Sequence, residues 1–277
     1  EIKATNNLEE ALMDMDYLLI TIPTQFVKET LEQVKPLIKK KITVINAAKG
    51  FDLGTNMRMS DTIRSVLDEN LINPVVSLIG PSHAEEVARK DITLITAACE
   101  NLDSAKKVQS LFMNDYLRIY TNKDVIGVET GAAFKNVIAI GAGALHGLGY
   151  GDDAKAALMT RGLAEISRLG VAFGADPLTF IGLSGVGDLI VTCTSVHSRN
   201  WRAGNQLGKG KALDEVIQDM GMVIEGINTC KAAYELAQQK NIEMPITEAI
   251  YNVLYNGKDI KDEISLLMQR EGKEEIK

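Results

Sequence analysis

A lysine in unusually apolar surroundings is the first candidate for chemistry. Lys135 lies in a segment with helical periodicity, and small or apolar residues stand on both sides of it, 131–134 before and 137–139 after. An ammonium group in such a place either extends to water or stays buried. Burial would lower its pKa and make the amine a usable proton donor and acceptor. The residues alone leave both alternatives open.

Two other charged residues stand where ligands commonly bind. Lys49 follows a predicted strand and precedes Gly50; it is either a solvent-exposed strand-end lysine or a group that reaches a ligand at the sheet edge. Asp188 and Thr192 are four residues apart on a predicted helix, so their side chains share a face. Asp188 can also be explained as a helix N-cap, because it follows two glycines.

The triplet Ser198-Arg199-Asn200 has the chemistry of an anion site. A serine at a helix start leaves backbone N–H groups free, the helix dipole favours an anion there, and a guanidinium can donate two hydrogen bonds to phosphate oxygens. The competing interpretation is a capped surface helix with an exposed arginine.

Metal and hydrolase chemistry find little support in the sequence. The three histidines are scattered and lack a metal-ligand spacing, so we expect no metal site. A Gly-x-Ser-x-Gly segment is absent, which removes the usual hydrolase nucleophile. An odd number of widely spaced cysteines indicates reduced thiols and a cytoplasmic protein. The histidines are His83, His146 and His197, and the cysteines are Cys99, Cys193 and Cys230.

The overall charge limits the classes of partner. The chain has 37 acidic and 30 basic side chains, a formal charge of -7 and a pI of about 5.2. Such a molecule repels nucleic acid and anionic lipid, and we find no stretch apolar for long enough to span a bilayer. We therefore expect neither nucleic-acid binding nor membrane insertion, and an anionic ligand would need a local positive pocket.

Two kinds of segment divide the 277 residues. Apolar runs typical of strands alternate with helical periodicity in the first part, which predicts a largely parallel sheet covered by helices. After about residue 124 only helical segments follow. We predict an α/β domain over residues 1–122 and an all-helical domain over 123–277. The predicted strands are 17–22, 42–47, 75–79, 92–98 and 117–120. The predicted helices are 5–12, 25–39, 57–68, 103–113, 125–148, 153–173, 178–194, 200–207, 212–218, 225–239 and 246–255.

The ends of three predicted strands carry unusual residues. They are followed by Pro23-Thr24-Gln25, by Ala48-Lys49-Gly50 and by the segment from Gly80 to Glu86. Ligands bind at the carboxyl ends of strands in a sheet of this class, so we expect these three segments to face one crevice. The Gly-x-Gly-x-x-Gly loop of dinucleotide-binding proteins is absent from the chain.

Six segments, in order along the chain, resemble those of the bacterial NAD(P)-dependent glycerol-3-phosphate dehydrogenases. They are Leu19-Ile20-Thr21-Ile22-Pro23-Thr24, Asn46-Ala47-Ala48-Lys49-Gly50, Gly80-Pro81-Ser82-His83-Ala84, Glu129-Thr130-Gly131-Ala132-Ala133-Phe134-Lys135-Asn136, Gly185-Val186-Gly187-Asp188-Leu189 and Ser198-Arg199-Asn200. The resemblance implies a partial Rossmann-type domain followed by a helical domain like that of 6-phosphogluconate dehydrogenase. It also implies that about 60 residues with the glycine loop would precede Glu1, so we expect the 277-residue chain alone to bind a dinucleotide weakly.

The resemblance also implies roles for single residues. The family's general acid/base corresponds to Lys135, and its residue that touches substrate and nicotinamide corresponds to Lys49. The implied substrate-binding residues are Lys49, Gly80, Ser82, Lys135, Asp188, Thr192, Ser198, Arg199 and Asn200. The implied cofactor-binding residues are Lys49, Ala84, Arg199, Val223 and Glu225, with NAD or NADP as the cofactor.

The function implied by the resemblance is reversible hydride transfer between NAD(P)H and dihydroxyacetone phosphate. The product, sn-glycerol 3-phosphate, would feed glycerophospholipid synthesis, and the family is compatible with a homodimer. Two alternatives stay open: a related two-domain dehydrogenase acting on a hydroxy or keto acid, and a non-catalytic fragment. The phosphate triplet argues against the first, and the joint presence of Lys49, Lys135 and Asp188 argues against the second.

Overall fold

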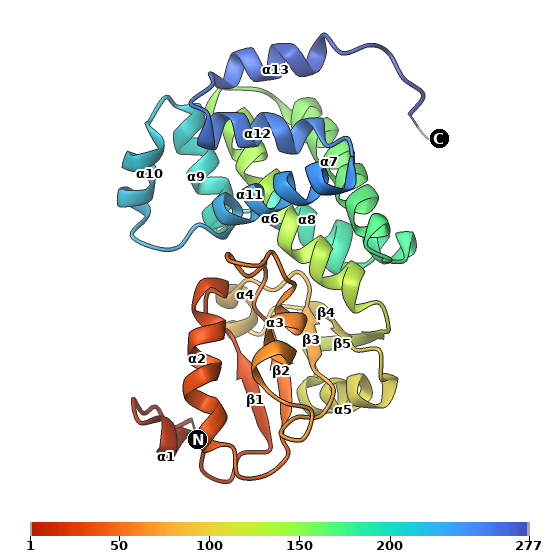
Figure 1. Cartoon of the computed structure of the whole chain (residues 1–277). Helices are drawn as coiled ribbons and strands as arrows, with labels where there is room; N and C mark the ends of the chain where they lie inside the picture. The colour runs from red at the N-terminus through yellow and green to blue at the C-terminus, as the bar shows by residue number, and fades with distance from the viewer. Residues whose placement is uncertain (1, 276–277) are drawn as a thin grey trace.

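The computed structural model describes residues 2–275, which form two lobes (Figure 1). One lobe holds the sheet and the other is helical, so the predicted fold class is confirmed. The strands are β1 (Tyr17–Ile20), β2 (Thr43–Asn46), β3 (Val76–Ile79), β4 (Thr93–Ala98) and β5 (Leu117–Asn122). The helices of the first lobe are α1 (Leu8–Ala11), α2 (Val27–Val34), α3 (Met59–Val66), α4 (Ala84–Ala88) and α5 (Leu102–Phe112). Those of the second are α6 (Val125–Gly147), α7 (Asp152–Ala172), α8 (Asp188–Thr194), α9 (Arg199–Gly208), α10 (Leu213–Met220), α11 (Glu225–Lys240), α12 (Pro245–Tyr255) and α13 (Ile260–Met268).

The described strands form one sheet in the order β1-β2-β3-β4-β5. The pairs β1–β2, β2–β3 and β4–β5 are parallel, as the sequence predicts, but β4 runs antiparallel to β3. The connection between β3 and β4 contains only the five-residue helix α4. It therefore lacks the long covering helix of a parallel crossover, and the chain returns beside β3. The carboxyl ends of β1, β2 and β3 consequently lie together at one edge.

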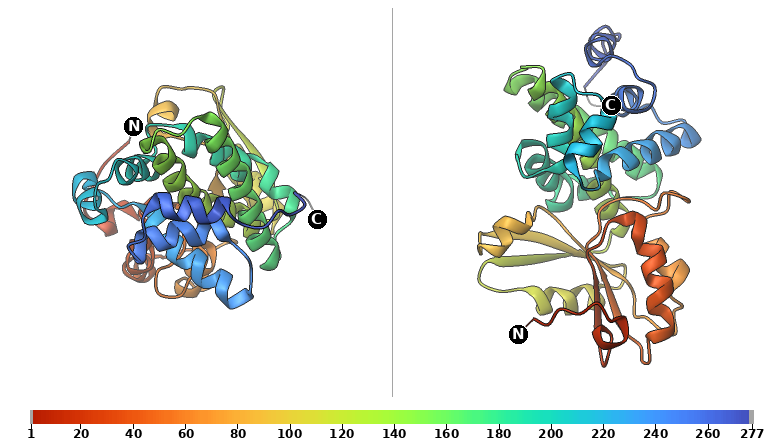
Figure 2. Two further views of the ribbon diagram at one scale, coloured as in Figure 1. Left: turned by 90° about the horizontal axis from the view of Figure 1, so that it is seen from above. Right: turned by 90° about the vertical axis from the view of Figure 1, so that its left-hand side faces the viewer.

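Helices cover both faces of the sheet (Figure 2). Leu31 of α2 and Ile63 of α3 pack in one buried cluster with Val44. The next residue of β2, Ile45, points to the opposite face and packs in a second cluster with Val108 of α5. This alternation is the two-residue period of a strand, and apolar residues at both positions show that β2 is buried on both faces.

Helix α6 connects the two lobes and forms the core of the second. Its residues 127–144 are all buried. Near its start, Val128 packs with Ile79 at the end of β3, and further along α6 packs against α7, α8, α9 and α11. By length and apolar composition α6 could cross a bilayer, contrary to our expectation from the sequence. However, 89% of its most apolar window is buried within the protein, which makes it a core helix.

Glycines allow α6 and α9 to pack with their backbones nearly in contact. A Cβ atom on Gly204 of α9 would lie 1.9 Å from the carbonyl oxygen of Ile140, and one on Gly143 of α6 would lie 2.0 Å from the carbonyl oxygen of Trp201. Both distances are far below van der Waals contact, so neither position accepts a larger residue without a shift of one helix.

The predicted helix over 178–194 is interrupted. The structure has a 3₁₀ segment at Pro177–Ile181, a π-helical segment at Leu183–Gly187, and then α8. A Cβ on Gly185 would lie 2.1 Å from the carbonyl oxygen of Phe180, so this tight path requires glycine. The interruption makes Asp188 the first residue of α8.

Two helices were not expected from the sequence. Helix α4 is short, and α13 lies beyond the last predicted helix, which ends at residue 255. The signal for α13 was present, because the Asp259 side chain accepts hydrogen bonds from the backbone N–H groups of Lys261 and Asp262 as an N-cap.

The packing of α6 against α9 leads to a first prediction. Gly204→Ala should lower the free energy of unfolding by about 1–3 kcal/mol or more, because the added methyl group has no space against the α6 backbone. Thermal unfolding followed by circular dichroism measures this loss. Gly272→Ala is the matched control, since a Cβ there meets nothing within 4 Å. Equal melting temperatures for the two variants would contradict the described packing.

Candidate active site

Lys135 is buried in the middle of α6 and its ammonium group has two side-chain partners. The residue is only 4% exposed. Its Nζ donates to the Asp188 carboxylate and lies 2.8 Å from the hydroxyl oxygen of Thr192, to which it also donates. The Thr192 hydroxyl in turn donates to the Asp188 carbonyl oxygen over 2.6 Å. Of the two alternatives open from the sequence, the structure places Lys135 in the buried one.

A second ammonium group meets the same carboxylate from the other lobe. Lys49 Nζ lies 3.1 Å from Asp188 Oδ2 and donates to the Gly80 carbonyl oxygen over 2.9 Å. Asp188 is 1% exposed and Lys49 is partly exposed. The carboxylate therefore binds two lysines, one from each lobe, and does not cap α8.

Burial is the main influence on the acidity of Lys135. It lowers the pKa of this ammonium group to about 7, because the charged form loses hydration. The negative charge of Asp188 opposes the shift, and the positive charge of Lys49 adds to it. An amine with a pKa near neutrality can both donate and accept a proton at physiological pH.

The three strand ends do converge on the helical lobe. Lys49 follows β2 and reaches the Gly80 carbonyl, which follows β3. At the end of β1, the backbone N–H and the hydroxyl of Thr24 donate to the Glu225 carboxylate over 3.1 and 2.9 Å. Ser82 and Ala84 lie exposed after β3, and the Ser82 hydroxyl donates to the Gly80 carbonyl over 3.0 Å. The strand ends that follow β1 and β2 thus contact the helical lobe through Glu225 and Asp188.

The predicted phosphate triplet lies at the start of α9. Ser198 is the N-cap, and its hydroxyl accepts a hydrogen bond from the Trp201 backbone N–H over 3.2 Å. Arg199 Nη1 donates to the carbonyl oxygen of Val223 over 3.2 Å, and Asn200 Oδ1 accepts from the Gly226 N–H over 2.8 Å. The triplet thus lies beside the Val223 and Glu225 segment, and its hydrogen bonds within residues 2–275 do not reach Lys135 or Asp188.

A buried carboxylate at the boundary of the lobes was not singled out from the sequence. Glu129 of α6 is 4% exposed and accepts hydrogen bonds from Asn46, Ser60 and Ser77. Its signal was available, since Glu129 stands six residues before Lys135 in the same small and apolar helix and a lone acid there needs partners.

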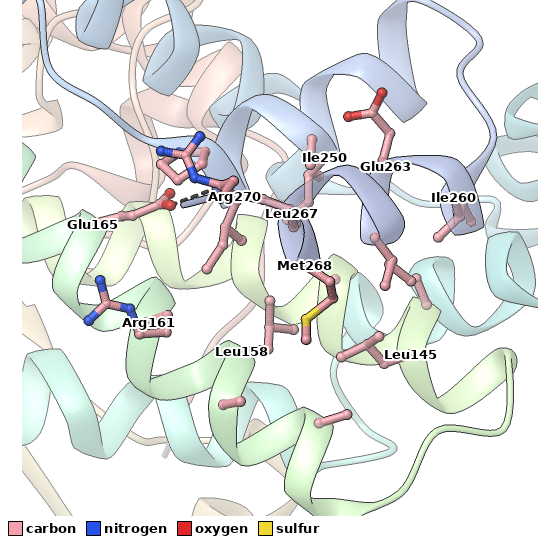
Figure 3. A pocket seen from close by; sticks show the side chains of 18 of the residues that line it. Leu145, Leu158, Arg161, Glu165, Ile250, Ile260, Glu263, Leu267, Met268 and Arg270 are labelled. Atoms are coloured by element: carbon pink, nitrogen blue, oxygen red, sulfur yellow. Dashed lines mark hydrogen bonds between the residues drawn. The ribbon is translucent and has the colours of Figure 1, made fainter. Parts of the chain in front are cut away.

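A large cavity lies apart from these residues. It has a volume of about 890 Å³ and lies between α6, α7, α12 and α13 (Figure 3). Leu145, Leu158 and Leu267 contribute to its apolar wall, and Arg161 and Glu165 lie toward one end. Its lining contains none of the predicted site residues, so it is separate from the cluster around Lys135.

Comparison with known proteins identifies the family of the chain. A family model described as "NAD-dependent glycerol-3-phosphate dehydrogenase N-terminus" matches residues 1–105, and the corresponding C-terminus model matches residues 124–265. The chain belongs to the NAD-dependent glycerol-3-phosphate dehydrogenase family. It is an NAD(P)-dependent oxidoreductase of this family.

Individual relatives agree with this assignment. A protein named glycerol-3-phosphate dehydrogenase [NAD(P)+] from Ligilactobacillus salivarius is 80% identical over 279 residues, with 100% of this chain and 82% of the relative covered. One with the same name from Enterococcus faecalis is 63% identical over 274 residues, with 99% and 81% covered. The crystal structure of a glycerol-3-phosphate dehydrogenase from Coxiella burnetii superposes with a TM-score of 0.91 at 35% identity, covering 97% of this chain and 81% of that one.

More distant structures show the fold alone. A ketopantoate reductase from Ralstonia eutropha superposes with a TM-score of 0.54 at 15% identity, covering 93% of this chain and 79% of that one. A keto-acid enzyme therefore shares the two-domain architecture, while the sequence relationship is to the glycerol-3-phosphate dehydrogenases.

Proposed function

We propose that Lys135 is the proton donor and acceptor of a reaction that interconverts dihydroxyacetone phosphate and sn-glycerol 3-phosphate. The observation that carries this assignment is the buried ammonium group of Lys135 between Asp188 and Thr192. When bound, NAD(P)H would supply the hydride for the carbonyl carbon of the substrate. As that C–H bond forms, the carbonyl oxygen becomes an alkoxide, and the proton of the Lys135 ammonium group neutralises it. In the reverse direction the neutral amine accepts the hydroxyl proton.

Asp188 and Thr192 orient the reactive amine in this proposal. Asp188 keeps the ammonium group of Lys135 in one place and compensates its charge, while the Thr192 hydroxyl accepts a second N–H. The third N–H of Lys135 is then the one that faces the substrate oxygen. Lys49 adds a positive field next to the developing alkoxide and lowers the pKa of Lys135 by repulsion between like charges.

We assign recognition of the substrate phosphate to the start of α9. Arg199 donates one N–H to Val223 and has further guanidinium donors for phosphate oxygens. The helix dipole of α9 favours an anion near Ser198 and Asn200. Gly80 and Ser82 form the opposite wall in the sheet lobe in this assignment.

The residues at the boundary of the lobes fit the nicotinamide end of a dinucleotide. Lys49 brings positive charge to the carboxyl edge of the parallel strands, the usual place for such a ligand. Arg199 binds Val223, two residues before Glu225, which contacts Thr24 after β1. Val223 and Glu225 from the helical lobe and Ala84 from the sheet lobe complete the set that would hold the cofactor. The glycine loop that carries a pyrophosphate is not among the 277 residues.

We also propose a cytoplasmic location and a homodimeric assembly. The free thiols Cys99, Cys193 and Cys230 are all buried, which suits a reducing compartment. The chemistry of the reaction, which consumes and delivers small phosphorylated metabolites, suits the same compartment. Size-exclusion chromatography with light scattering tests the assembly directly, and a monomer at micromolar concentration would exclude the homodimer.

Removal of the amine tests the assignment of Lys135. Lys135→Ala in the full-length enzyme should lower kcat by about 10² to 10⁴, the usual contribution of a positioned general acid or base. Substrate binding should partly survive, because the phosphate contacts are separate groups. Lys155→Ala is a control on α7, where the lysine pairs with the exposed Asp152. A near-normal kcat for Lys135→Ala at saturating substrate and cofactor would remove this residue from its role.

Removal of the guanidinium group tests the phosphate assignment. Arg199→Ala should mainly raise KM for dihydroxyacetone phosphate, by about 10- to 100-fold, because a charge-assisted contact of about 1.5–3 kcal/mol is present in the ground and transition states alike. Reduction of unphosphorylated dihydroxyacetone should change little. Arg202→Ala, three residues along α9 and exposed, is the matched control. An equal loss with both substrates would show that Arg199 serves the cofactor or the fold.

A further inference from the structure

Glu129 occupies the point where the sheet meets helix α6. Its Oε1 accepts from the Asn46 side-chain amide over 3.2 Å, from the Ser60 backbone N–H over 3.1 Å and from the Ser77 hydroxyl over 2.6 Å. Its Oε2 accepts from the Ser60 hydroxyl over 2.7 Å and lies 3.6 Å from Arg58 Nη1. Each hydrogen-bonding partner can act as a donor, so the ionised carboxylate satisfies all of them, and Arg58 adds a nearby positive charge.

Burial works against that ionised state. It raises the pKa of Glu129, while hydrogen bonds from Ser77 and Ser60 and the charge of Arg58 lower it. A carboxylate held in this way has few alternative positions, because each departure leaves several buried donors without an acceptor.

The partners of Glu129 lead directly to the reactive cluster. Asn46 ends β2, and its side chain also binds the backbone of Ala48, accepting from the N–H over 3.1 Å and donating to the carbonyl over 3.3 Å. This fixes the chain one residue before Lys49. Ser77 lies in β3, three residues before Gly80, whose carbonyl accepts from Lys49. The same carboxylate thus holds the two strand ends that Lys49 connects.

We propose that Glu129 is a positioning residue for the dehydrogenase reaction, acting through Lys49. Its carboxylate fixes the ends of β2 and β3 against α6, and thereby sets the position of Lys49 relative to Lys135 and Asp188. The proposal rests on the proposed function in one respect, namely that the placement of Lys49 beside Lys135 matters for turnover.

The rival interpretation is that Glu129 only stabilises the fold, and the chain contains a matched control for it. Glu165 of α7 is 3% exposed and accepts hydrogen bonds from the Ile246 N–H over 2.7 Å and from the N–H and hydroxyl of Thr247 over 3.0 and 2.9 Å. It holds the start of α12, and these hydrogen bonds reach neither Lys49 nor Lys135 nor Asp188. Glu165→Gln therefore reproduces the loss of a buried carboxylate without a connection to Lys49.

The direct test is a double-mutant cycle in the full-length enzyme. Glu129→Gln alone should lower kcat/KM by about 10- to 100-fold, the scale of a misplaced reacting group. In the Lys49→Met background the same change should cost less than about threefold, because its effect acts through the lysine already removed. Glu165→Gln should lower the melting temperature but leave kcat/KM within about threefold in both backgrounds. Equal losses for Glu129→Gln in the two backgrounds would overturn the proposal.

The pH profile gives a second, independent readout. Reduction needs protonated Lys135, so its rate falls as the pH rises through the pKa of this group. If Glu129→Gln lets Lys49 move away, repulsion on Lys135 decreases and this alkaline limb should move to higher pH, whereas Glu165→Gln should leave it in place. Glu129→Asp, which keeps the charge on a shorter side chain, should show the same shift with a smaller loss of stability, and it serves if Glu129→Gln fails to fold.

The outcomes separate this proposal from the proposed function. If Lys49→Met has nearly normal kcat/KM, the placement of Lys49 does not matter and the positioning role of Glu129 fails with it. If Lys135→Ala retains the alkaline limb, the acid–base assignment fails, while a non-additive cycle between Glu129 and Lys49 still supports positioning. An unshifted limb in both Glu129 variants, together with additive losses, would show that Glu129 is structural only.

Discussion

Burial of the Lys135 ammonium group is the constraint on which the rest of the structure depends. A charge that is 4% exposed in a helix of small and apolar residues needs an opposite charge, and Asp188 is the carboxylate that meets it. Removing Asp188 would leave the buried ammonium group uncompensated, which costs about 3–5 kcal/mol in comparable pairs. The position of Asp188 is therefore as critical as that of the lysine, and the interrupted helix with Gly185 puts it at the start of α8.

The same constraint relates the two lobes. Asp188 also binds Lys49. The negative charge of Asp188, which lies in the helical lobe, is therefore balanced partly by a lysine of the sheet lobe. Glu225 with Thr24 and Glu129 with Asn46 add two further polar contacts across the boundary. All three contacts involve the ends of β1 or β2, the edge at which a parallel sheet binds ligands. The contact between Lys49 and Asp188 therefore both joins the lobes and completes the reactive cluster.

The sequence predicted the regular strands and helices better than the places where the chain departs from a regular pattern. The apolar runs located all five strands, and their ends met as the parallel pattern requires. The antiparallel pairing of β4 with β3 depends on the short connection through α4. Five residues are too few to show the hydrophobic periodicity of a helix, so the sequence did not indicate it. The π-helical segment depends on contact between Gly185 and the Phe180 backbone, which spacing alone does not reveal. For the site, periodicity paired Asp188 with Thr192, but only the tertiary structure shows that both bind Lys135 and that Glu129 organises the strand ends.

The central claim is that Lys135 changes its protonation state near neutral pH because it is buried between Asp188 and Lys49. Nuclear magnetic resonance of lysines labelled with ¹³C at Cε measures this directly, and Lys135→Met identifies the resonance. The account predicts one lysine signal with a midpoint near pH 7, well below the value of about 10.4 for exposed lysines. If every lysine signal titrates above about pH 9, the account is contradicted, since an ordinary ammonium group would be a poor base at physiological pH.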